Sequence, residues 1–132
     1  MSDRYRHVKN ADVFYLASYS DSESDLSYLS DRDTVINIIE DLLPKGAKKH
    51  EGFAIIENLW LSYTIHYNVD YIPARNGYRV AIWYDIEGVL GLLFSTHCEK
   101  VCENIVMGIY DYARKNHLQI QEFLTHSSVV YY

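Results

Sequence analysis

The segment Leu61–Tyr71, "LSYTIHYNVDY", constrains the fold more than any other part of the chain. Its odd-numbered residues are apolar or aromatic, whereas its even-numbered residues from Ser62 to Asp70 are polar. Successive side chains of a β-strand point to opposite sides, so this alternation indicates a strand with one buried face and one wet face. Such strands are typical of antiparallel sheets that pack against other elements on one side only.

The segments after this strand predict a meander. "IPARNG" is expected to turn the chain, with Asn76-Gly77 as residues favoured at positive φ. Tyr78–Asp85, "YRVAIWYD", alternates as a second strand, and Val89–Ser95, "VLGLLFS", is apolar on both faces as expected for a central strand. A further strand is predicted at Asp12–Ser18, and a small basic loop is predicted at Lys45–His50. Two segments, residues 52–60 and 118–124, fit either a strand or a short helix.

Two helices are predicted, one before the meander and one after it. The first spans Asp31–Leu43, where apolar residues recur at helical spacing and Pro44 follows as a stop signal. The second spans Thr96–Lys115, with a capping box at its start and Asn116 as a left-handed cap. The whole chain, residues 1–132, is therefore expected to form one α+β domain. It should hold a mostly antiparallel sheet with a central meander, and two main helices packed on one face.

Composition and charge narrow the functional classes. The net charge of −6 disfavours nucleic-acid binding, which needs a basic surface, and suits a basic protein partner. No apolar run reaches the ~18 residues of a membrane helix, and the N-terminus lacks the apolar core of a secretory signal. We therefore expect a cytoplasmic protein without membrane contact. Tyrosine is abundant, at 13 residues, and suits both strand positions and interfaces.

The two cysteines do not indicate catalysis or metal binding. Cys98 and Cys102 lie four residues apart on the apolar stripe of the second predicted helix, so both should be buried, reduced core residues. His97 is adjacent to Cys98 in sequence, but adjacent helical residues do not face each other and form no catalytic dyad. No second ligand pair completes a zinc site. We expect no enzymatic activity, cofactor or metal.

The stretch Ser18–Asp33, "SYSDSESDLSYLSDRD", is the most acidic part of the chain. As an EF-hand loop it fails, because Leu26 stands where the loop needs glycine and Arg32 where it needs a bidentate glutamate. Its carboxylates repel one another, and a basic partner would relieve that repulsion. A solvated loop with no partner is the alternative. The predicted partner-binding residues are Tyr19, Asp21, Glu23, Asp25 and Tyr28.

In this profile the chain resembles the immunity proteins of bacterial polymorphic toxin systems, including contact-dependent growth inhibition. The resemblance is carried by "SDSESDLSYLSDRD", by the tyrosine-bearing strands "SYTIHYNVDY" and "YRVAIWYD", and by the size of the chain. It implies a protein that binds a cognate toxin domain, often a basic nuclease, and blocks its active site.

Other functions remain open at this point. A secretion chaperone is also small and acidic, and a phage-encoded inhibitor would have the same profile. A small-molecule-sensing domain would use a pocket beneath the meander, around His66 and Trp83. Otherwise the polar row that holds His66 is simply the wet face of the sheet. The sequence leaves the oligomeric state open.

Overall fold

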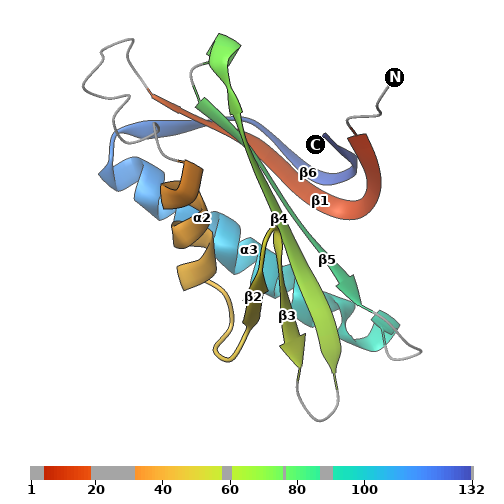
Figure 1. The fold of residues 1–132 in the computed structure, drawn as a ribbon. Helices are drawn as coiled ribbons and strands as arrows, with labels where there is room; N and C mark the ends of the chain where they lie inside the picture. Colours follow the sequence, from red (N-terminus) through yellow and green to blue (C-terminus); the bar gives the residue numbers. More distant parts are fainter. Residues whose placement is uncertain (1–4, 19–31, 58–60, 76, 87–90, 132) are drawn as a thin grey trace.

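The computed structural model describes residues 5–18, 32–57, 61–75, 77–86 and 91–131 (Figure 1). The regular elements follow in this order: β1 (Tyr5–Ser18), α2 (Arg32–Asp41), β2 (Lys48–His50), β3 (Phe53–Glu57), β4 (Ser62–Ile72), a 3-10 helix (Pro73–Arg75), β5 (Gly77–Ile86), α3 (Gly91–Lys115) and β6 (Leu118–Tyr131).

The six strands form one antiparallel sheet in the order β2-β3-β4-β5-β1-β6. Strands β2 to β5 are a meander of consecutive neighbours, and β1 lies between β5 and β6. Figure 1 shows α3 running behind the strands and the paired β1 and β6 curling together at the end near Tyr5. The curl coincides with register shifts between His7 and Tyr15, since bulges bend and twist a strand.

Strand β4 has the predicted alternation. Tyr63, Ile65, Tyr67 and Val69 are buried, whereas the intervening side chains remain partly exposed. The buried residues lie in the main hydrophobic core with Val35 and Ile39 of α2 and with the inner stripe of α3 (Cys98, Cys102, Ile105, Val106, Ile109 and Ala113). Both helices therefore cover the same face of the sheet, which confirms the predicted α+β class.

Polar contacts fix α2 against β4. The Tyr67 hydroxyl donates to Glu40 Oε2 at 3.0 Å, and Arg32 Nε donates to the carbonyl oxygen of Val69. Burial and the Glu40 hydrogen bond both raise the pKa of Tyr67, which keeps this phenol a donor. Helix α2 is thus held at both its first and its last turn.

The prediction of a third meander strand at Val89–Ser95 was wrong. Residues Gly91–Ser95 form the first turn of α3, and residues 87–90 lie outside the described part. An apolar run without period 2 also fits a buried helix, and the predicted cap at Thr96 placed the helix start five residues too late. At the other end of α3 the left-handed residue is His117 (φ 56°) rather than Asn116, whose Nδ2 donates to the Tyr112 carbonyl.

Other segments differ from the prediction in smaller ways. The basic segment expected as a loop contains strand β2, and β1 begins at Tyr5 rather than Asp12. Gly77 opens β5 without positive φ, and the described glycines at positive φ are Gly46 (φ 85°), before β2, and Gly52 (φ 85°), between β2 and β3. The two ambiguous segments are strands β3 and β6. Neither α2 nor α3 contains a stretch both long and apolar enough to cross a membrane.

Candidate functional site

The face of the sheet that α2 and α3 leave uncovered carries the strongest candidate site. The register places Phe53 of β3 opposite His66 of β4, and His66 opposite Trp83 of β5. All three therefore point to the same side, away from the buried row of Tyr63, Ile65 and Tyr67.

Four rings form a continuous row across this face, with one ring from each strand of the meander. His50 of β2 stacks on Phe53, with ring centroids 4.8 Å apart, and Phe53 lies 6.1 Å from His66 in a tilted arrangement. His66 stacks on Trp83 at 5.0 Å with only 7° between the ring planes. We call His50, Phe53, His66 and Trp83 the aromatic row. Such cross-strand pairs stabilise neighbouring strands, and their exposed edges offer a rigid contact surface.

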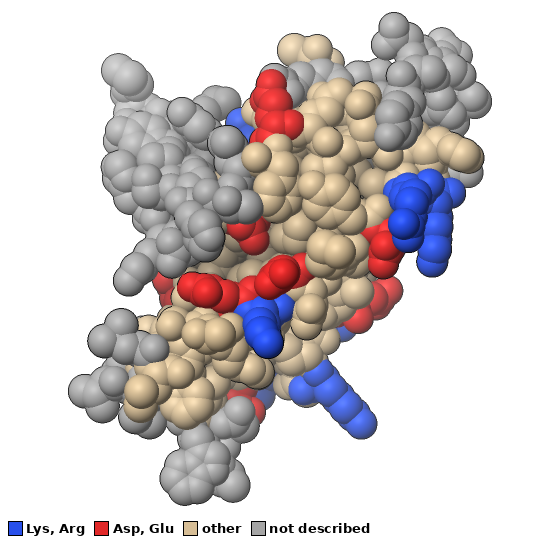
Figure 2. Space-filling view, turned by 180° about the vertical axis from the view of Figure 1, so that it is seen from behind, with Lys and Arg blue, Asp and Glu red and all other residues tan. Residues whose placement is uncertain are grey.

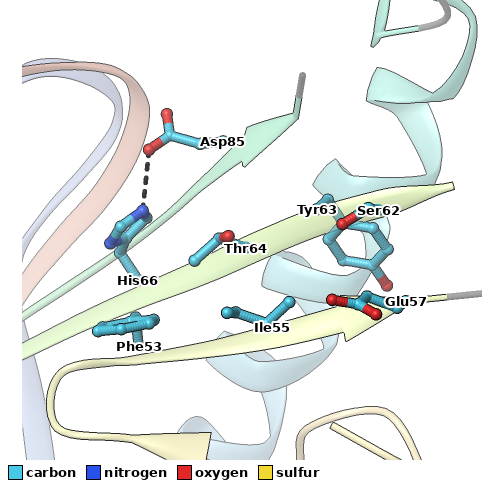
Figure 3. A pocket seen from close by; sticks show the side chains of 8 residues that line it. All are labelled: Phe53, Ile55, Glu57, Ser62, Tyr63, Thr64, His66 and Asp85. Carbon is cyan, nitrogen blue, oxygen red and sulfur yellow. Dashed lines mark ion pairs between the residues drawn. The ribbon is translucent and has the colours of Figure 1, made fainter. Parts of the chain in front are cut away.

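A carboxylate orients the histidine of β4. His66 Nε2 lies 2.8 Å from Asp85 Oδ2 of β5, and the side chains are 17% and 56% exposed (Figure 3). The pair is therefore sheltered on its histidine side and open on its carboxylate side. Further along the same face, Arg79 of β5 lies 3.6 Å from Asp70 of β4.

A hollow of about 480 Å³ opens beside the aromatic row. It is lined by Phe53, Ile55, Glu57, Ser62, Tyr63, Thr64, His66 and Asp85. Figure 3 shows Phe53, His66 and Asp85 at one end, Glu57 and Ser62 at the other, and Ile55 and Thr64 between them. The hollow thus combines one aliphatic and one hydroxyl-bearing side chain in its middle with a carboxylate at each end.

Trp83 is the most deeply buried member of the aromatic row. It is 3% exposed and forms a second small core with Ala11, Ala81 and Val13, on the side opposite the helices. Its Nε1–H is buried and donates to no acceptor among the described residues. A buried donor without an acceptor is uncommon, because it loses its hydrogen bond to water.

This face offers aromatic rings, hydroxyls and carboxylates as contact groups. A histidine beside an aspartate is also part of many nucleophilic sites, but such sites need a thiol or hydroxyl that the histidine activates. Both cysteines are free and buried in the core on the opposite face, where burial raises the pKa of Cys98 to about 11 and also raises that of Cys102. No thiolate is therefore available to His66 at neutral pH.

The described residues also contain no group of three or more His, Cys, Asp or Glu side chains placed to hold a metal ion. His66 and Asp85 would supply two ligands only. The predicted burial of both cysteines is confirmed.

On the helical side, charges of both signs are mixed. Figure 2, seen from behind Figure 1, shows acidic and basic side chains interspersed over that surface. An example is the exposed pair of Asp111 and Arg114 on α3, whose atoms lie 3.0 Å apart. Among the residues drawn in colour, that side offers no extended area of one sign.

The residues predicted to bind a partner, Tyr19, Asp21, Glu23, Asp25 and Tyr28, all lie outside the described residues. The structure does show where their segment attaches. It leaves β1 at Ser18 and enters α2 at Arg32, which contacts Val69. The hollow lies near Ser62–His66, so the attachment points are toward the opposite end of β4.

Sequence reasoning named His66 and Trp83 together and missed their neighbours. The alternation of Tyr78–Asp85 places Trp83 and Asp85 on the same side, a signal that could have pointed to the Asp85 carboxylate. Phe53 and Ile55 were missed because their segment fitted a strand or a helix equally well.

No known protein family, curated protein or solved structure matches the chain.

Proposed function

We propose that this protein binds a basic partner protein through the helix-free face of its sheet and inhibits it by occlusion, in the manner of the immunity proteins that its sequence profile resembles. The observation that carries this proposal is the aromatic row, in which Phe53 and His66 remain partly exposed on the face that α2 and α3 leave uncovered.

The composition of the face favours a protein partner. Aromatic side chains held rigid by stacking provide contact area at little entropic cost, and they dominate the energetics of many interfaces. The carboxylates of Glu57 and Asp85 are 55% and 56% exposed beside the row. Together with the net charge of −6, they favour association with a cationic surface.

Inhibition by occlusion requires neither catalysis nor a cofactor from this chain, so the proposal includes no enzymatic step. It places the protein in the bacterial cytoplasm, where an immunity protein meets its toxin. The acidic stretch between Ser18 and Arg32 would add a second contact region, through the residues Tyr19, Asp21, Glu23, Asp25 and Tyr28.

The test compares two alanine variants on opposite sides of the sheet, of which the control removes the more exposed side chain. Phe53→Ala removes the centre of the partly exposed row, whereas Met107→Ala removes a 55% exposed side chain on α3. Tagged wild-type protein is used to capture partners from a lysate of the source organism, and the captured protein is purified and titrated against each variant. We expect Phe53→Ala to weaken binding by about 2 kcal/mol, or roughly 30-fold, and Met107→Ala to change it less than threefold.

The reverse pattern would contradict the proposal, because it would place the interface on the helical side. Equal loss in both variants with lowered thermal stability would point to unfolding, so each variant is also checked by circular dichroism. The salt dependence of the association rate gives an independent measure, and a basic partner requires the rate to fall as salt is raised.

A second function, small-molecule binding, is favoured by one observation, the sheltered pair of His66 and Asp85 at one end of the hollow. The size of the hollow, about 480 Å³, also falls within the range of ligand pockets. Native mass spectrometry of protein purified from its own source distinguishes the two functions. A retained compound that the Phe53→Ala variant releases supports the small-molecule function.

A further inference from the structure

We infer that the hollow receives an extended segment of the partner in which two basic residues are four positions apart and a small apolar residue lies between them. This inference rests on the proposed function and specifies which part of the partner the sheet recognises.

The spacing comes from the strand register. Glu57 of β3 lies opposite Ser62 of β4, and Asp85 of β5 lies opposite Thr64 of β4. The two carboxylates therefore sit two strands apart and two residues apart along the strands. With strand spacings of about 4.8 Å and a rise of about 3.4 Å per residue, their Cα atoms are roughly 12 Å apart.

In an extended peptide, every second side chain points to the same side. Residues i and i+2 are about 7 Å apart, and residues i and i+4 about 13 Å apart, with all three facing the same way. The second spacing matches the separation of Glu57 and Asp85. The residue at i+2 then lies over β4 between Ser62 and Thr64, with Ile55 of β3 beside it, near the middle of the hollow in Figure 3.

Both carboxylates have capacity for a new cation. Glu57 is 4.0 Å from Lys48 of β2, an exposed pair that holds the two groups only weakly. Asp85 contacts His66 through Oδ2, and a carboxylate has about four acceptor sites, so the histidine uses a fraction of them.

The test uses two peptides of identical composition. One is a seven-residue capped peptide with arginines four positions apart and valine midway, and the other has the arginines adjacent. Each is titrated into the full chain by calorimetry and by NMR. We expect the spaced peptide to bind at least about fivefold more tightly, because only it reaches both carboxylates at once.

Charge-neutralising variants locate the contacts. Glu57→Gln and Asp85→Asn should each weaken the spaced peptide about two- to fivefold. The effects should multiply in the double variant, since the two sites are more than about 10 Å apart and share no partner. Asp111→Asn on α3 removes the same charge from the opposite side of the molecule and should change affinity less than twofold.

Several outcomes overturn the inference. Equal affinity for the two peptides would show that the spacing of the arginines does not matter. If Asp111→Asn weakens binding as much as Glu57→Gln or Asp85→Asn does, the peptide responds only to the net charge of the protein. Spermidine binding as tightly as the spaced peptide, with the same dependence on Glu57 and Asp85, would assign the hollow to small polyamines. If no peptide binds at millimolar concentration while Phe53→Ala still releases the full-length partner, the inference fails and the proposed function stands. If Phe53→Ala has no effect on the partner, the proposed function fails as well.

Discussion

Replacing Trp83 by phenylalanine should leave the free energy of unfolding nearly unchanged, although this side chain is only 3% exposed. The reason is the indole Nε1–H, which is buried and donates to no acceptor among the described residues. Phenylalanine removes that donor and keeps a ring that can stack on His66. The variant therefore exchanges a loss of packing for the removal of an unsatisfied group.

The two effects are of similar size. An unsatisfied buried donor costs about 1–3 kcal/mol, which phenylalanine recovers. The smaller ring leaves roughly 40 Å³ unfilled, and at about 24 cal/mol per Å³ this costs about 1 kcal/mol, with a further contribution from the lost transfer free energy. The sum should lie within about 1 kcal/mol of zero. Trp83→Ala, by contrast, should cost about 3–5 kcal/mol.

The measurement is urea unfolding followed by far-ultraviolet circular dichroism, because removal of a tryptophan alters the fluorescence signal. The two variants and the wild type should share one m-value, so that midpoint differences report stability. A loss above about 2 kcal/mol in Trp83→Phe would refute the reasoning, since it would mean that the indole N–H has an acceptor in solution.

Three other substitutions test the packing and the pH dependence. Gly77→Ala should destabilise by about 1–3 kcal/mol in thermal unfolding, because its Cβ would lie 2.4 Å from the Leu16 carbonyl oxygen; an unchanged melting temperature would contradict that contact. Gly108→Ala would place a Cβ 2.4 Å from Leu42 Cδ1, so the higher helix propensity of alanine, about 1 kcal/mol, should stabilise the protein only when Leu42 is also replaced by alanine. A double-mutant cycle that shows no coupling between the two substitutions would argue against this contact. Burial raises the pKa of Cys98 from 9.0 to about 11, so the folded state retains this proton as pH rises and the thiol's contribution to stability is lost between those values. Between pH 9 and 11 the Cys98→Ala variant should therefore lose less stability than the wild type, by up to about 1.4 kcal/mol per pH unit. If denaturant titrations give the two proteins the same dependence of stability on pH, the raised pKa of Cys98 is refuted.

Periodicity predicted the faces of the sheet but not the partners of its residues. The alternation in Leu61–Tyr71 correctly separates the core residues from His66 and its polar neighbours up to Asp70, whereas Tyr71 is 47% exposed. It does not determine which residue of β3 or β5 lies opposite His66, because the register depends on turn length and on where each strand begins. The pairing of His66 with Asp85 and the stacking on Phe53 therefore required the structure.

The segment wrongly predicted as a strand shows where periodicity fails to identify the type of element. Val89–Ser95 has no polar residue to mark a face until its last position, so neither period 2 nor period 3.6 can be tested within it. Within Gly91–Ser95, Phe94 packs against the main core one turn before Cys98 and so extends the inner stripe of α3 backwards. The predicted acidic contact residues, Asp21, Glu23 and Asp25, lie outside the described residues and stay a prediction.

The position of β1 has a consequence for how the chain folds during synthesis. This strand leaves the ribosome first among the six, yet its two neighbours are β5 and β6. About 100 residues separate Ser18 from Leu118, which corresponds to about 5–20 s of translation at common rates. In the first part of that time β2, β3 and β4 can pair locally, while Phe14 and Leu16 have no strand to join until β5 emerges. Closure of the sheet by β1 should therefore be the late, rate-limiting event, and the nascent chain is most prone to aggregation before β5 emerges.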